Sequence, residues 1–167
     1  MDDLSEKIEF VDVVYAVEGQ RKVLQTNLKH TATVREFAVV VATQYGLAGE
    51  IDVFVEDADG PLDQEQVLAT CLTAKFKPLH VATRGHIRVT VEYNGQKIED
   101  SFRSGATVRA VISWAIGLRG FNLDGGPGDF QIKSGQEVVP ADVHLGQLAH
   151  GSKELVLWLV FKIKQQG

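Results

Sequence analysis

The feature that most constrains the fold of this 167-residue chain is an internal repeat. When the sequence is shifted against itself by 74 positions, Ala32–Arg35 falls on an identical tetrapeptide at Ala106–Arg109. Polarity and turn residues then match in the same order over about 70 positions, a length typical of one small repeated domain. The second copy has three extra residues after Gly120, and one later deletion restores the match. The repeat predicts two copies of one domain, residues 1–83 and 84–162, followed by a flexible tail at 163–167.

The joint between the copies lies near Thr83–His86 and contains no Pro-rich or Ser-rich linker. We therefore expect the two domains to lie close together with restricted freedom. Their charges differ: seven Lys and Arg against 14 Asp and Glu up to Thr83 give −7, whereas ten against eight beyond it give +2. This difference predicts that the two halves meet different partners.

Composition excludes several classes of protein. With 44% hydrophobic and 23% charged residues, the chain is typical of a globular protein. No apolar run reaches the roughly 18 residues of a membrane helix, and Met1–Leu4 does not resemble the start of a signal peptide. Cys71, the single cysteine, can form neither an internal disulfide nor a zinc cluster. With a net charge of −5 as well, we expect a cytoplasmic protein with no cofactor, metal, membrane or nucleic-acid partner.

Alternating apolar residues predict a strand at the start of each copy, over Val13–Val17 and Ile87–Val91. A polar turn follows in both, and the second contains the pair Asn94-Gly95, which favours a tight hairpin. The strands expected to close the two hairpins are Val23–Leu28 and Lys97–Phe102.

The apolar period then changes to that of a helix, beginning at Val34 in one copy and at Val108 in the other. Thr33 with Glu36 has the pattern of a capping box, and Thr107 is a simpler cap. Gly46 and Gly120 lie where the helices are expected to end. The remaining strands are expected at Asp52–Glu56, Asp129–Lys133, Leu79–Ala82 and Leu155–Phe161, with room for one more short strand or turn before the last.

This order of elements is the β-grasp plan, and the second copy resembles ubiquitin over nearly all of residues 86–167. Phe130–Gln136 is similar to ubiquitin's third strand and turn, Val143–Leu148 to the loop before its last strand, and Lys153–Lys164 to its closing strand. Two such domains in tandem resemble the interferon-induced two-domain modifier of vertebrates and its bacterial counterparts in antiphage operons. The resemblance implies an α+β protein of two tandem ubiquitin-like β-grasp domains, and no enzymatic activity.

Modifiers of this family are joined to target amines through a C-terminal glycine carboxylate, and this chain ends Gln165-Gln166-Gly167, with Gln where the family has Gly. The resemblance implies conjugation through Gly167, either directly or after cleavage of a longer precursor. It also implies an adenylating activating enzyme, a conjugating enzyme, a processing or deconjugating protease and target proteins as partners. Lys162 and Lys164 stand where ubiquitin has arginines, so we expect the tail, with Gln165 and Gln166, to contact the activating enzyme. A solvated basic end is the alternative.

The last strand also predicts a binding surface. If Leu155, Leu157 and Leu159 face the helix, then Val156, Trp158 and Val160 lie on the outer face, where a contiguous apolar patch is typical of recognition. Gln131 occupies the place of ubiquitin's central isoleucine in this patch. The alternative is that Trp158 packs against the first domain. The matching positions of the first copy, His80 and Ala82, are polar or small, so that copy is expected to be a poorer recognition surface.

No other motif carries a strong signal. Cys71 is expected to be a buried residue, and Trp114 to pack beside the helix stripe. His30, His80, His86, His144 and His150 lack the spacing of metal ligands, and Gly125–Gly128 lacks the lysine of a phosphate-binding loop. We expect no catalytic residue. Two functions stay open beside conjugation: a non-covalent adaptor that docks through its sheet faces, and sulfur carriage on a C-terminal thiocarboxylate.

Overall fold

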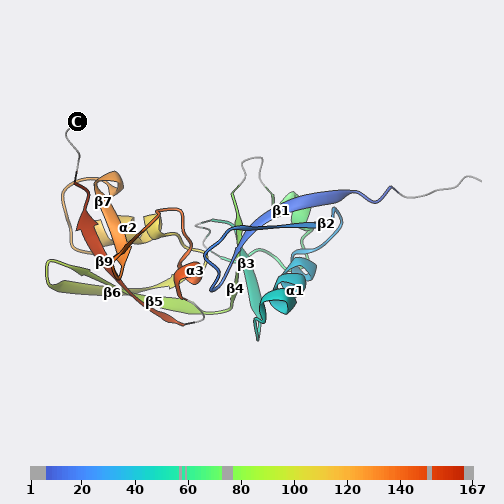
Figure 1. The fold of residues 1–167 in the computed structure, drawn as a ribbon, viewed down its shortest axis with the longest axis horizontal. Helices are drawn as coiled ribbons and strands as arrows, with labels where there is room; N and C mark the ends of the chain where they lie inside the picture. Colours follow the sequence, from blue (N-terminus) through green and yellow to red (C-terminus); the bar gives the residue numbers. More distant parts are fainter. Residues whose placement is uncertain (1–6, 57, 59, 73–76, 150–151, 164–167) are drawn as a thin grey trace, which may run out of the picture.

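A computed structural model describes residues 7–56, 58, 60–72, 77–149 and 152–163. Its first half forms a four-stranded sheet in the order β2-β1-β4-β3, crossed by one helix (Figure 1). The elements are β1 (Phe10–Val17), β2 (Leu24–Lys29), α1 (Val34–Tyr45), β3 (Ile51–Phe54), the 3-10 turn η1 (Leu68–Thr70) and β4 (Leu79–Thr83). The terminal strands β1 and β4 are parallel, and the other pairs are antiparallel.

The second half repeats this arrangement with one more strand, in the order β6-β5-β9-β7-β8. Its elements are β5 (His86–Tyr93), β6 (Gln96–Arg103), α2 (Val108–Ile116), η2 (Pro127–Asp129), β7 (Phe130–Ser134), β8 (Glu137–Val139), α3 (Leu145–Ala149) and β9 (Glu154–Phe161). Here too the first and last strands, β5 and β9, are parallel. The expectation of two tandem β-grasp domains is therefore confirmed.

The hairpin of the second domain has the turn that its sequence predicts. Tyr93 pairs with Gln96, and the two residues between them have positive φ angles, 48° at Asn94 and 77° at Gly95. Positive φ at both central residues is the geometry of a type I′ turn, which matches the twist of the flanking strands. The turn therefore sets the register of the long β5–β6 ribbon.

The helix caps agree with the sequence at three of four ends. The Oγ1 of Thr33 accepts a hydrogen bond from the Glu36 N–H (3.2 Å), and the Oγ1 of Thr107 accepts one from the N–H three residues further on (3.4 Å). Gly46 ends α1 in the left-handed conformation, with φ of 68°. The prediction for Gly120 is wrong, because α2 ends at Ile116 and Gly117 is its C-cap.

Gly120 is a glycine for a different reason. The chain turns tightly after α2, and a Cβ at this position would come within 2.3 Å of the Ala115 carbonyl oxygen. A tight turn and a helix end both favour glycine, so the residue type alone does not distinguish them.

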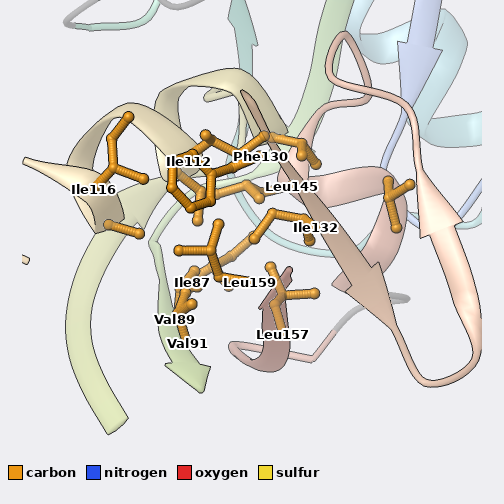
Figure 2. Close-up of a cluster of buried hydrophobic side chains, with 14 of the residues drawn as sticks. Ile87, Val89, Val91, Ile112, Ile116, Phe130, Ile132, Leu145, Leu157 and Leu159 are labelled. Atoms are coloured by element: carbon orange, nitrogen blue, oxygen red, sulfur yellow. The ribbon is translucent and has the colours of Figure 1, made fainter. Parts of the chain in front are cut away.

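Each domain has its own hydrophobic core between sheet and helix. In the second domain the core joins β5, α2, β7 and β9 (Figure 2). Its central members are fully or almost fully buried: Ile87, Val89, Val91, Ile112, Phe130, Ile132, Leu145, Leu157 and Leu159. Trp114 packs at the edge, with its ring 5.3 Å from that of Phe102, as expected. Burial of this kind provides most of the stability of a small domain.

The joint between the domains is short. β4 ends at Thr83, and β5 begins at His86 after Gly85, which has φ of 137°. Among the described residues, no helix is long and apolar enough to cross a membrane.

Candidate functional site

The outer face of β9 carries the apolar residues that the alternation predicts. Leu157 and Leu159 are buried in the core, whereas Val156 is 50% exposed and Trp158 37% exposed on the opposite face. Val160 on the same face is half-buried. We call Val156, Trp158, Val160 and Gln131 the outer patch.

Neighbouring strands frame the outer patch with polar side chains. Trp158 pairs in register with Lys133 on one side and with Glu92 on the other. Glu92 forms an ion pair with a lysine of β6, Lys97, at 3.1 Å. Gln131 pairs with Val160, which places the amide at the end of the patch nearest the C-terminal tail. An apolar centre with a polar, charged rim is typical of a protein-binding surface.

One exposed apolar residue of this face was missed by the sequence analysis. Val138 is 45% exposed and pairs with Lys133, so it lies in the same cross-strand row as Trp158. The signal was weak because β8 has only three residues, too few to show a period.

The start of the C-terminal tail is the only part of the tail that the structure describes. After β9, the Lys162 N–H donates a hydrogen bond to the Asp129 carbonyl (2.8 Å), and the Lys162 side chain is exposed. Ile163 is 91% exposed, so the chain has left the body of the domain at this point. The other predicted tail residues, Lys164, Gln165, Gln166 and Gly167, lie outside the described residues.

The equivalent face of the first domain is covered. Ala16, His80 and Phe54 form one cross-strand row over β1, β4 and β3, and Ala82 lies next to this row. All four are at most 3% exposed, although none of them points into the first domain's own core cluster. We call these four residues the inner face. The second domain covers it: Gly105 lies against Phe54, and Gly146 lies against His80.

His80 and Ala82 point away from the core, as the alternation predicts, but the sequence does not predict that they are buried. Alternation within a strand specifies a face and says nothing about what lies over that face. The polarity of His80 fits a surface residue equally well, so no signal in the sequence marked it as part of a junction.

Polar contacts join the two domains around the inner face. The Gly19 N–H donates to the Gly146 carbonyl (3.0 Å), and the Gln147 side-chain amide lies within 3.4 Å of two carbonyls of the β1–β2 turn. The carboxylate of Glu18 accepts hydrogen bonds from the backbone N–H and hydroxyl of Thr83, and it lies 3.5 Å from the Lys153 Nζ. These contacts, together with the short joint, hold the two domains against each other.

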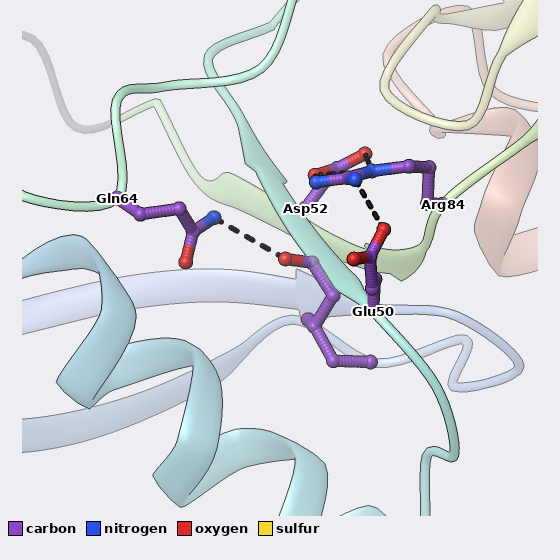
Figure 3. A network of polar contacts seen from close by, with 5 residues as sticks. Glu50, Asp52, Gln64 and Arg84 are labelled. Carbon is purple, nitrogen blue, oxygen red and sulfur yellow. Dashed lines mark hydrogen bonds and ion pairs between the residues drawn. The ribbon is translucent and has the colours of Figure 1, made fainter.

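A second polar network fixes the end of the first domain beside the joint (Figure 3). Arg84 forms a forked pair with the buried carboxylate of Asp52, 3.1–3.4 Å, and another pair with Glu50. The hydrogen bond to Asp52 raises the pKa of Arg84 above its ordinary value. The Gln64 amide donates to the Ile51 carbonyl (3.2 Å), which ties the loop after β3 to the same strand. This network is structural.

Two of the weaker candidates, Cys71 and the segment Gly125–Gly128, make local contacts with the backbone. Cys71 is nearly buried, and its Sγ lies 3.7 Å from the Val67 carbonyl oxygen. Gly125–Gly128 is a turn that leads into η2, where the Asp129 carboxylate accepts a hydrogen bond from the Gly126 N–H. Within the part of the chain that is described, no three His, Cys, Asp or Glu residues are placed to hold a metal ion. His150 lies outside that part.

Comparisons with known proteins found one family model and solved structures that are similar to part of this chain. A family model described as BilA ubiquitin-like domain 2 matches residues 88–162. Among solved structures, a ubiquitin of Caldiarchaeum subterraneum is 16% identical, with a TM-score of 0.39, over 47% of this chain and 96% of that one. A chain of the pParkin–pUb–UbcH7 complex is 20% identical, with a TM-score of 0.36, over 47% of this chain and 25% of that one. No curated protein matches the chain.

The topology and the family match together define the class: this is a protein with two tandem ubiquitin-like β-grasp domains. Its second domain is similar to the second ubiquitin-like domain of BilA.

Proposed function

We propose that this protein is a ubiquitin-like modifier, joined to target amines through the Gly167 carboxylate. The observation that carries the proposal is the second domain: a ubiquitin-like fold, similar to a BilA domain, whose last strand leads directly into an exposed segment at Lys162 and Ile163. Because Ile163 is already 91% exposed, an enzyme can bind the chain from this residue onward without any change in the folded domain.

The chemistry belongs to the partner enzymes. An adenylating enzyme joins the carboxylate to the AMP part of ATP and releases pyrophosphate, and an enzyme thiol then displaces AMP to form a thioester. A target amine attacks the thioester, an amide bond forms, and the thiol is released. The modifier provides the acyl group and the recognition surfaces. Lys162 contributes positive charge at the base of the tail, where its side chain is exposed.

The outer patch provides recognition of the conjugating machinery or of readers of the modification. It is the exposed sheet face of the molecule's second domain, whereas the inner face of the first domain is already covered. We therefore place partner binding on the second domain and give the first domain a supporting role. The setting implied by the resemblance, bacterial defence against phage, is part of the proposal.

The test compares adducts in the native host. The protein carries a tag at Met1, and wild type is compared with a form that lacks Gly167 and with Gln165→Ala, which changes the same tail but keeps the terminal glycine. We expect higher-mass adducts on a denaturing gel for wild type and for Gln165→Ala, and none for the deletion. Adducts that persist without Gly167 would contradict conjugation through this residue.

A non-covalent adaptor is the second candidate, and the exposed Trp158 favours it. An adaptor would give no adducts with any form, and it would recover partners under native conditions that Trp158→Ala loses and the Gly167 deletion keeps. Sulfur carriage would appear instead in the mass of the intact protein, as the exchange of one oxygen for sulfur at the C-terminus.

A further inference from the structure

Two histidines meet face to face at the centre of the junction between the domains. His80 comes from β4 of the first domain, and His144 from the residue before α3 of the second. Their rings are stacked, with centroids 4.8 Å apart and an angle of 17° between the planes. His80 is 0% exposed and His144 is 1% exposed.

The fit around His80 is tight on the side of the second domain. A Cβ at residue 146 would come within 2.2 Å of the His80 Nε2, so only glycine allows this approach. Gly146 also accepts the hydrogen bond from the Gly19 N–H described above. The position of the His80 ring is thus coupled to a backbone contact that exists only when the domains are together.

The surroundings offer little to a charged ring. Within the described residues, neither ring nitrogen of His80 has a hydrogen-bond partner. Ala16 and Phe54 pair with residue 80 from β1 and β3, and Gly146 and the stacked imidazole approach the ring from the second domain; none of these four carries a carboxylate. Three carboxylates of the junction are paired with cations: Glu18 with Lys153, Asp52 with Arg84, and Glu137 with Arg21.

We propose that the stacked pair His80–His144 is a pH-sensitive latch that holds the two domains together when the rings are neutral and releases them when protons bind. A positive charge on His80 in the closed form would be buried without a counter-ion and would face a second buried imidazole, that of His144. Separation of the domains returns both rings to water, where the charged form is stable. The latch opens the junction without unfolding either core, because each domain has its own.

The direction of the pH effect follows from the burial. Burial, with the neighbouring His144 as a smaller cause, holds the pKa of His80 well below its ordinary value of 6.5. The open form therefore binds more protons than the closed form as the pH falls below about 6.5, and acid favours opening. Above this range both forms carry neutral rings, and the contact has its full strength. For each proton taken up, the closed-to-open ratio falls about tenfold per unit of pH.

The exchange of the Gly19 amide hydrogen reports on this contact, because its hydrogen-bond acceptor lies in the other domain. We would measure its protection factor by NMR from pH 8 to pH 5, with the Leu159 amide in the second core as an internal reference. Wild type is expected to keep protection of Gly19 down to about pH 6.5 and then to lose about tenfold or more per unit of pH, while Leu159 stays protected. A protection of Gly19 that does not change with pH would overturn the proposal.

Two variants and one control complete the test. His80→Phe keeps a flat ring that binds no proton and should make the protection of the Gly19 amide independent of pH. A pH dependence of this protection as steep as in wild type would overturn the proposal. His30→Phe changes an exposed histidine and should keep the wild-type slope. Gly146→Val places a side chain against residue 80 and gives the open reference at every pH. If His80→Phe itself opens the junction, the test depends on wild type at pH 5. The Gly19 protection factor of wild type at this pH must then equal that of Gly146→Val, and a higher value rejects the latch.

Discussion

Gly105 of the second domain lies directly against the ring of Phe54 in the first, so closely that a Cβ at residue 105 would come within 2.6 Å of the Phe54 Cβ. In the repeat, Gly105 corresponds to Thr31, and Gly146 corresponds to Ala69, because the preceding residues Leu68 and Leu145 donate equivalent backbone hydrogen bonds to Ala32 and Ala106. Both of these residues carry a Cβ, and a Cβ does not allow the same approach to a sheet face. The first domain therefore lacks the surface with which the second domain covers the inner face.

The first prediction concerns this contact. Gly105→Val forces a branched side chain into a filled space and should lower the free energy of unfolding by about 1–3 kcal/mol, or separate the domains. Urea unfolding together with exchange of the Gly19 amide measures both effects. Gly126→Ala is the matched control, because a Cβ there meets no atom within 4 Å and its φ is not positive. Equal behaviour of the two variants would mean that the junction is not tightly packed.

Substitutions on the two faces of β9 should have different effects: a loss of stability on the buried face and a loss of partner binding on the exposed face. Leu157→Ala removes a fully buried side chain from the core and should cost about 2–5 kcal/mol in the free energy of unfolding. Trp158→Ala, one residue away on the outer patch, should change stability by about 1 kcal/mol or less and should abolish partner recovery from host lysate. Partner recovery that survives Trp158→Ala at normal stability would place recognition elsewhere.

The buried carboxylate of Glu18 should be energetically coupled to the other domain. Glu18→Ala removes the acceptor for the Thr83 N–H and hydroxyl and the ion-pair partner of Lys153, whose Nζ keeps its hydrogen bond to the Thr83 hydroxyl (3.0 Å). We expect a loss of about 1–3 kcal/mol in the free energy of unfolding. A double-mutant cycle with Lys153→Met isolates the contact between Glu18 and Lys153, which joins the domains. Its coupling energy should be about 1 kcal/mol because Lys153 is partly exposed. A coupling energy of zero would show that only the Thr83 hydrogen bonds matter.

Alkaline pH should destabilise the first domain through Tyr15. Burial, and then a hydrogen bond with Tyr45, raise the pKa of Tyr15 from 10.0 to about 12. The unfolded chain therefore loses this proton first, and stability is expected to fall as the pH rises from about 10 to about 12. Amide protection in β1–β4 should decrease over this range in wild type. In Tyr15→Phe the decrease should be smaller, and an unchanged decrease would assign the effect to other groups.

Particular elements show how much of the fold could be predicted from the sequence. The Asn94-Gly95 turn, the Thr33 cap and the left-handed Gly46 were predictable because each depends on a backbone geometry that its own residues favour. The helix end predicted at Gly120 was wrong because a close approach between backbones requires glycine as strictly as a helix end does. The short strand β8 was not assigned because three residues show no period, and the exposed Val138 was missed with it.

The repeat, the order of elements and the inward and outward faces of β9 were thus determined by the sequence alone, since each follows from spacing along one chain. Only the tertiary structure decided how the two sheet faces are used: the outer patch is exposed, and the inner face is buried beneath Gly105, His144 and Gly146. The physical reason is that burial of an outward-facing residue depends on shape complementarity between segments far apart in sequence. His80 illustrates the difference, because its residue type is typical of a surface and its place in the fold is the centre of a junction.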